Sequence, residues 1–237
     1  MIFTVMNNSK QAAARPFNAT EKTVLLIVFV LMIIGIVAAN VNKTWFLQQY
    51  VVEDGFIEDL TLIPLAIITL TAIIYLVKYA RRKNAWFFLV YLGIGLASFF
   101  VLGEEISWGQ RIFNFQTSEY FKEHNSQDEE NIHNLVLDGE RLNKIIFTNA
   151  LVVCVIIYLI VLPLLYQKNL NFRNFIDKAT VPVPTVQQAI ACALVFGSSF
   201  LTFDDKGAEL LEFGGSAVFM LIVLFPVNKF SLSMQRK

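Results

Sequence analysis

The sequence predicts an all-α integral membrane protein, a helical bundle with about six transmembrane helices, and three observations support this. First, 56% of the 237 residues are hydrophobic and only 16% are charged, which is too apolar for an ordinary soluble domain. Second, the hydrophobic residues form continuous blocks rather than the alternation of half-buried helices or strands. Third, the blocks approach the roughly 20 residues with which a helix crosses a bilayer core about 30 Å thick. A single transmembrane domain is therefore expected over residues 1–237.

Each hydrophobic block is assigned to one helix in chain order. The first block, 24–41, is longer than the core of a typical signal peptide and follows a polar stretch, so we expect a retained helix. Pro182 and Pro184 precede the fifth block, where the start of a helix accepts proline. The expected spans are 23–41, 56–79, 85–107, 144–166, 185–203 and 207–227, and the long outer loop is 108–143.

The basic and acidic residues fall on opposite sides of the predicted bundle. If the N-terminus is cytoplasmic, 13 of the 19 Lys and Arg residues lie on that side, including four at 78–83. Cytoplasmic loops are enriched in these residues, so we expect both termini in the cytoplasm. Of the 19 acidic residues, only Glu21 and Asp177 fall on the same side. Acidic residues do little to set topology, so their excess on the outer side indicates a function there.

Glu104 and Glu105 are the most informative of the outer carboxylates. They end the apolar run 85–103 at the C-terminus of a helix, where the helix dipole disfavours negative charge. Two carboxylates in this position need a cation, a proton or a strong hydrogen-bond donor. A salt bridge from Arg111 is the simplest alternative to a functional role. Asp204, by contrast, is expected to be a replaceable cap at the start of the last helix.

A divalent metal site is one hypothesis for these carboxylates. Glu130 and His133 have the Glu-x-x-His spacing that places both side chains on one helix face, as in carboxylate-bridged two-metal bundles. The chain has only two histidines, which excludes a three-histidine zinc site and favours Mg²⁺, Ca²⁺, Mn²⁺ or non-haem iron. Simple solvation of outer acidic residues is the alternative. The candidate ligands are Glu104, Glu105, Glu130, His133, Glu209 and Glu212.

The segment 108–121 mixes aromatic and polar residues after the third predicted span. This pattern predicts an amphipathic element that lies at the membrane interface over the helix ends, or a simple aromatic belt. The sequence contains no nucleotide-binding loop, serine-hydrolase elbow or zinc-protease helix. It also contains no basic patch beyond the topology signals, so nothing supports binding to nucleic acid.

Two motif runs lie in and after this segment. They are Gly103-Glu-Glu-Ile-Ser-Trp-Gly-Gln-Arg111 and Asn125-x-Gln127-x-Glu129-Glu130-Asn131-x-His133-Asn134. Together with Glu53-Asp-Gly-x-Ile-Glu58, the chain from about residue 53 to 134 resembles a group of uncharacterised bacterial multi-pass membrane proteins. The resemblance implies location in a bacterial cytoplasmic membrane but no particular reaction. It also implies that the following residues form one unit: Glu104, Glu105, Trp108, Gln110, Arg111, Glu130, His133 and Asn134.

Three functional hypotheses are compatible with this pattern. In the first, an enzyme acts on a lipid or lipid-linked substrate that reaches the site from the bilayer, with Trp108, Gln110 and Asn134 in contact with it. Its catalytic residues would be Glu104, Glu105, Arg111 and His133, acting through a metal or as acid and base. In the second, a transporter uses the carboxylates as a cation entry site, which requires polar residues through the bilayer. In the third, a non-catalytic scaffold docks a protein partner.

Overall fold

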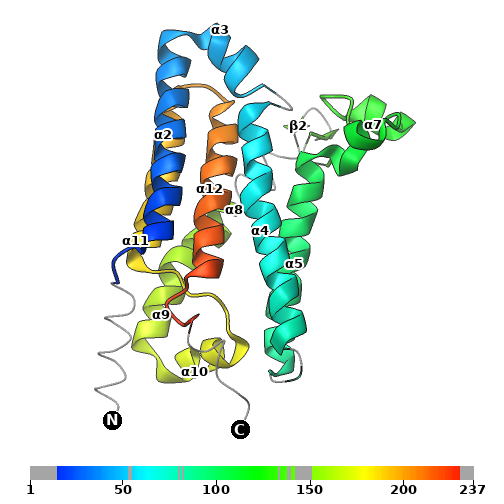
Figure 1. Ribbon diagram of the computed structural model, residues 1–237. Helices are drawn as coiled ribbons and strands as arrows, with labels where there is room; N and C mark the ends of the chain where they lie inside the picture. The colour runs from blue at the N-terminus through cyan, green and yellow to red at the C-terminus, as the bar shows by residue number, and fades with distance from the viewer. Residues whose placement is uncertain are drawn as a thin grey trace.

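The computed structural model describes residues 15–52, 55–79, 81, 83–132, 134–137, 140–141 and 151–229. These residues are mainly helical, with one short β-hairpin in which β1 (Val136–Leu137) pairs with β2 (Glu140–Arg141). Figure 1 shows the long helices side by side, with their connections gathered at the two ends of the bundle. The helical architecture follows from the apolar blocks, because in lipid a helix satisfies its own backbone hydrogen bonds.

Four helices are long and apolar enough to cross a membrane. They are α2 (Ala19–Val41), α4 (Phe56–Tyr79), α5 (Ala85–Glu105) and α12 (Gly207–Leu224). Each corresponds to one expected span, so the prediction of a helical membrane bundle is confirmed.

The other two expected spans are less regular. Part of 144–166 lies outside the described residues, and the described part consists of α8 (Leu151–Ile156), the π-helical turn η4 (Ile157–Val161) and α9 (Leu162–Lys168). After α9 the chain bends by 119° into α10 (Leu170–Ala179). The fifth expected span consists of α11 (Val186–Ser199) and the 3-10 turn η5 (Phe200–Thr202), and it is shorter than the four long helices. The count of six crossings therefore stays a prediction.

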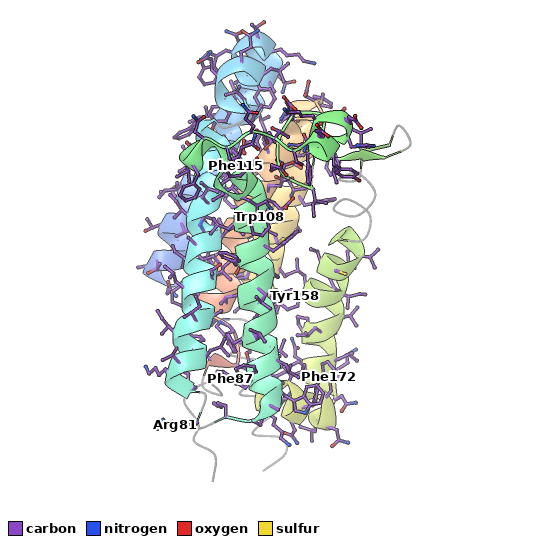
Figure 2. All side chains as sticks on the ribbon, turned by 90° about the vertical axis from the view of Figure 1, so that its right-hand side faces the viewer. Arg81, Phe87, Trp108, Phe115, Tyr158 and Phe172 are labelled. Atoms are coloured by element: carbon purple, nitrogen blue, oxygen red, sulfur yellow. The ribbon has the colours of Figure 1, made fainter. Side chains whose placement is uncertain are left out.

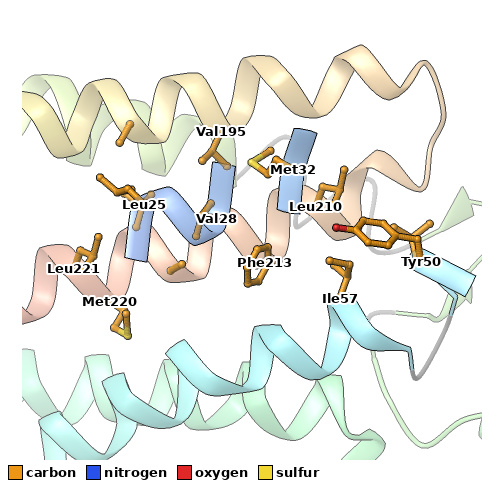
Figure 3. Close-up of a cluster of buried hydrophobic side chains, with 14 of the residues drawn as sticks. Leu25, Val28, Met32, Tyr50, Ile57, Val195, Leu210, Phe213, Met220 and Leu221 are labelled. Carbon is orange, nitrogen blue, oxygen red and sulfur yellow. The ribbon is translucent and has the colours of Figure 1, made fainter. Parts of the chain in front are cut away.

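Helix α12 lies at the centre of the bundle, packed against α2, α4 and α11. Figure 3 shows the buried side chains between these helices, among them Val195, Leu210 and Phe213. Glycines allow the close approach: a Cβ atom on Gly35 would lie 2.8 Å from Leu210 Cδ1, and one on Gly214 would lie 2.7 Å from Val195 Cγ1. Close packing of this kind is important for stability, because lipid provides no hydrophobic force that would hold the helices together.

Short helices lie at the end of the bundle that the sequence predicts to face outward, which is called the outer end below. These are α3 (Lys43–Trp45), the π-helical turn η1 (Phe46–Tyr50), the 3-10 turn η2 (Ser107–Gly109), α6 (Gln110–Phe113) and α7 (Glu119–His124). Asp204 pairs with Lys43 at 2.8 Å and accepts a hydrogen bond from the backbone N–H of Lys206 at 3.0 Å. The bond from Lys43 is the main cause that holds the pKa of Asp204 below its usual range. Asp204 was expected to cap α12, but the capping position is occupied by Lys206, so Asp204 instead joins the α11–α12 turn to α3.

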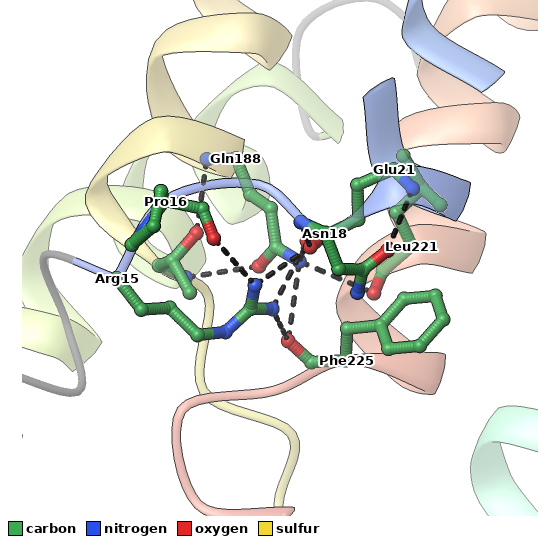
Figure 4. A network of polar contacts seen from close by, with 8 residues as sticks. Arg15, Pro16, Asn18, Glu21, Gln188, Leu221 and Phe225 are labelled. Atoms are coloured by element: carbon green, nitrogen blue, oxygen red, sulfur yellow. Dashed lines mark hydrogen bonds and ion pairs between the residues drawn. The ribbon is translucent and has the colours of Figure 1, made fainter. Parts of the chain in front are cut away.

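The other end is held together by a buried carboxylate, shown in Figure 4. Glu21 is fully buried, and its two oxygens accept hydrogen bonds from Arg15 at 2.6 and 3.0 Å and from Gln188 Nε2 at 2.8 Å. Arg15 also donates to the carbonyl oxygen of Phe225 at 2.7 Å. These contacts join the start of α2, the start of α11 and the end of α12. The described part of the chain thus begins and ends at the same end of the bundle.

Candidate functional site

The candidate site begins with an unusual turn after α5. Ser107, Trp108 and Gly109 all have positive φ, at 45°, 53° and 82°. Glycine adopts this conformation readily, whereas the two preceding residues do so at a cost. The turn folds the Trp108 ring back onto α5, where a Cβ atom on Gly103 would lie 2.9 Å from the indole atom Cε3. Gly103 is therefore needed because the indole occupies the space of a side chain.

The returning indole binds Glu104, which is only 2% exposed. Trp108 Nε1 donates to Glu104 Oε1 at 2.7 Å, and the backbone N–H of Ile132 donates to Glu104 Oε2 at 2.6 Å. Hydrogen bonds of this kind stabilise a carboxylate that burial would otherwise disfavour. The need for donors at Glu104 could be predicted from its position, but Ile132 could not, because its contact depends on the fold of the loop.

A second group of hydrogen bonds joins the turn to the 125–134 run. The hydroxyl of Ser107 donates to Glu129 Oε2 at 2.8 Å, and Asn131 Nδ2 donates to both of these residues, at 3.0 and 2.7 Å. Asn125 Nδ2 in turn donates to the Oδ1 and carbonyl oxygens of Asn131, at 2.9 Å each. Ser107 and Asn131 are both 1% exposed. These neutral residues were missed as site residues because only their place in the two motif runs distinguishes them.

Glu130 is held by a third set of contacts. Its backbone N–H donates to Gln110 Oε1 at 2.8 Å, and Gln110 Nε2 donates to the Thr117 hydroxyl at 2.7 Å. The Oε1 atom of Glu130 accepts the backbone N–H of Ser118, whereas Oε2 has no hydrogen-bond partner among the described residues. The prediction that Glu130 and His133 share a helix face is wrong: the chain from 126 to 132 forms turns and bends, because its Asn and Ser side chains bond to nearby backbone groups.

The remaining predicted site residues fall into two groups. Glu105 ends α5, and Asn134 donates its backbone N–H to Asn131 Oδ1 at 3.2 Å, so both lie next to the network. Glu209 pairs with Lys206 at 2.8 Å, and with Glu212 it lies on α12, which α4 separates from α5 (Figures 1 and 3). The structure therefore does not bring the whole predicted set together.

The predicted metal site is a separate matter, because His133 and the side chain of Arg111 lie outside the described part of the structure. Among the described residues, no three His, Cys, Asp or Glu side chains are close enough together to hold a metal ion. A metal site that includes His133 stays a prediction.

An open pocket of about 400 Å³ lies beside this network, lined by Trp108, Phe115, Phe121, Glu130 and Ile132. Figure 2 shows Trp108 and Phe115 at the outer end of α5. The lining is apolar except for the carboxylate of Glu130. Two of the walls, Trp108 and Ile132, are the residues that donate hydrogen bonds to Glu104. Glu104 therefore fixes the positions of two pocket walls.

Large apolar side chains next to the pocket are exposed. Ile112 and Phe113 on α6 are 71% and 76% exposed, and Tyr120 on α7 is 53% exposed. Aromatic and aliphatic residues in this position are typical of elements that lie at the level of the lipid headgroups.

Searches of family models, of curated proteins and of solved structures gave no match to this chain. The fold itself defines the class of protein. It is a helical, multi-pass membrane protein with a buried polar network at one end of its bundle.

Proposed function

We propose that this protein binds a lipid or lipid-linked molecule at the outer surface of a bacterial cytoplasmic membrane. The bacterial setting rests on the resemblance of the two motif runs. The observation that carries the proposal is the pocket beside Trp108, which is apolar apart from one carboxylate. The pocket is open rather than enclosed, and apolar surface rimmed by polar residues is typical of sites that contact a membrane or a ligand. The apolar chain of the ligand would lie along Trp108 and Phe115, with its polar group at Glu130.

The charge of the site favours a ligand with an amine in its polar group. Glu130 Oε2 has no hydrogen-bond partner among the described residues, and the aromatic walls offer faces to a cation. Among the exposed charged side chains described between residues 112 and 132, Glu119, Glu123 and Asp128 are acidic and Lys122 is basic. This field attracts ammonium groups and disfavours headgroups with a net negative charge. An aminolipid such as phosphatidylethanolamine, or an amine-bearing lipid-linked substrate, has the required chemistry.

The same geometry suits an enzyme that acts on such a substrate. Glu130 would then serve as the acid or base, since it lines the pocket and one of its oxygens is available. Both oxygens of Glu104 accept hydrogen bonds from the protein, which supports a positioning role for that residue rather than proton transfer. A transporter is less well supported, because the Thr69 and Ser98 hydroxyls bond to each other at 2.9 Å and to their own helices. These two hydroxyl groups therefore contribute to the packing of α4 against α5.

The proposal is tested by lipid binding to the purified protein. Native mass spectrometry with phosphatidylethanolamine, phosphatidylcholine and phosphatidylglycerol should show preference for the first. The Glu130→Gln variant should bind it about tenfold more weakly, because it loses a charge–charge contact worth roughly 1–2 kcal/mol. Asp59→Asn, which removes an exposed carboxylate on α4 that does not line the pocket, is the control and should bind like wild type. Equal binding by wild type and Glu130→Gln would overturn the proposal, and release of a cleaved lipid would establish an enzyme.

A further inference from the structure

A second lipid-facing feature lies at the opposite, cytoplasmic end of the bundle, around α10. Figure 1 shows this helix across the end of the bundle, after the 119° bend that separates it from α9. Buried contacts hold it in place. Arg173 is 4% exposed, and its Nε donates to the carbonyl oxygen of Tyr166 at 2.9 Å. Asp177 Oδ1 accepts the hydroxyl of Tyr166 at 2.9 Å and Asn228 Nδ2 at 3.2 Å. The charged residues inside the helix are thus used to anchor it.

The connection between α4 and α5 is joined to the same helix. Asn84 Nδ2 donates to the carbonyl oxygen of Lys178 at 2.8 Å, which places the residue after Lys83 beside the end of α10. Trp86 and Phe175 meet edge to face, with ring centroids 5.5 Å apart, and are 50% and 44% exposed. Two exposed aromatic rings therefore stand next to basic residues from two elements.

At the surface of this face, the described charged side chains are mainly positive. Lys78, Arg81, Lys168 and Lys178 are exposed, and Lys83 is partly buried, which lowers its pKa through desolvation. The acidic residues described on this face, Glu21 and Asp177, are hydrogen-bonded inside the protein. Within the described part of the chain, the exposed cations Lys78, Arg81, Lys168 and Lys178 are therefore not paired with either of these acidic residues.

We propose that this face binds the headgroup of an anionic phospholipid of the cytoplasmic leaflet. Lys83 and Lys178 would contact the phosphate, and Trp86 and Phe175 would pack against the glycerol and the upper acyl chains. The bias of basic residues towards the cytoplasm accounts for their side of the membrane. This bias does not account for the position of basic residues beside the ring pair of Trp86 on α5 and Phe175 on α10. Each Lys or Arg near an anionic surface contributes roughly 1 kcal/mol, so two of them are enough for selective binding.

The test uses the full-length protein in nanodiscs of phosphatidylcholine with and without phosphatidylglycerol. The anionic lipid should raise the melting temperature of wild type, and the K83Q/K178Q variant should lose most of that gain. Its phosphatidylglycerol affinity, measured by native mass spectrometry, should fall roughly tenfold or more. K83R/K178R, which keeps the charges, should bind like wild type and shows whether the positions tolerate substitution.

The decisive control is K22Q/K229Q, which removes two exposed charges that lie on α2 and after α12, whereas Trp86 and Phe175 lie on α5 and α10. It should retain nearly all of the response. If both glutamine pairs lose it equally, binding is due to diffuse surface charge, and the proposed site is wrong. A wild type that melts identically in both lipid mixtures would also overturn it. Neither result bears on the outer pocket, because that proposal concerns the opposite end of the bundle.

Discussion

At the scale of single residues, the run from Gly103 to Gly109 mainly stabilises the fold of the chain around the pocket. Gly103 gives space to the indole of Trp108, Glu104 accepts the indole N–H, and Gly109 adopts the left-handed turn that brings the ring back. The sequence was sufficient to identify Glu104 as a carboxylate that needed partners, because of its position after an apolar run. It was not sufficient to name those partners, since two consecutive non-glycine residues with positive φ are not expected from residue type.

The Trp108→Phe substitution tests this interpretation. It keeps the aromatic ring but removes the N–H that bonds to the carboxylate of Glu104, which is 2% exposed. The free energy of unfolding should therefore fall by about 1–3 kcal/mol. Thermal unfolding in detergent and the protease sensitivity of the outer loop would measure the loss. Trp45→Phe is the control, since Trp45 is also an exposed outer tryptophan and stacks on Tyr50. Equal melting temperatures for the two variants would show that the bond to Glu104 contributes little.

At the scale of elements, predictability follows the constraint that lipid imposes. The bounds of α2, α4, α5 and α12 could be predicted closely, because their apolar blocks end where polar residues begin. Helix α10 could not, since it lies in a polar stretch and depends on buried contacts of Arg173 and Asp177 for its orientation. The helix expected around Glu130 is absent from the described chain, because local side-chain bonds stabilise turns there instead.

Two adjacent glycines in α12 allow a direct test of helix packing. Gly214→Ala should destabilise the bundle by about 1–3 kcal/mol, because its Cβ would lie 2.7 Å from Val195 Cγ1. Gly215→Ala meets nothing within 4 Å and should leave stability unchanged or slightly raised, since alanine is the better helix former. Chemical or thermal unfolding in the same detergent compares the pair. If Gly215→Ala proves the more damaging, the assigned packing of α11 on α12 is wrong.

At the scale of the whole molecule, charge distribution and hydrophobic blocks predict the architecture and leave the number of crossings open. The bent fourth segment and the short fifth segment are the reason, because neither forms a single long apolar helix. The meeting of Arg15 with Phe225 places both ends of the described chain at one face. The outer pocket could not be predicted at this scale, since its walls come from a loop whose fold depends on many small contacts.

Cysteine labelling in cells tests the topology. In a background without Cys154 and Cys192, a cysteine at position 126, which is exposed in the outer loop, should react with a membrane-impermeant reagent. A cysteine at position 82, within the basic second connection, should react only after the membrane is permeabilised. The opposite pattern would place the acidic network in the cytoplasm and remove the basis for an outward-facing site.

The central position of α12 has a consequence for how the protein is made. The ribosome synthesises this helix after α2, α4 and α11, yet all three pack against it. Before it arrives, these earlier helices lack their common partner, and Arg15 has no carbonyl oxygen of Phe225 to bind. Their final arrangement must therefore wait until α12 has been synthesised. A chain that stops before α12 would leave Arg15 and Gln188, the partners of Glu21, without the carbonyl oxygens of Phe225 and Leu221 that they also bind, which distinguishes an unfinished product from a mature one for membrane quality control.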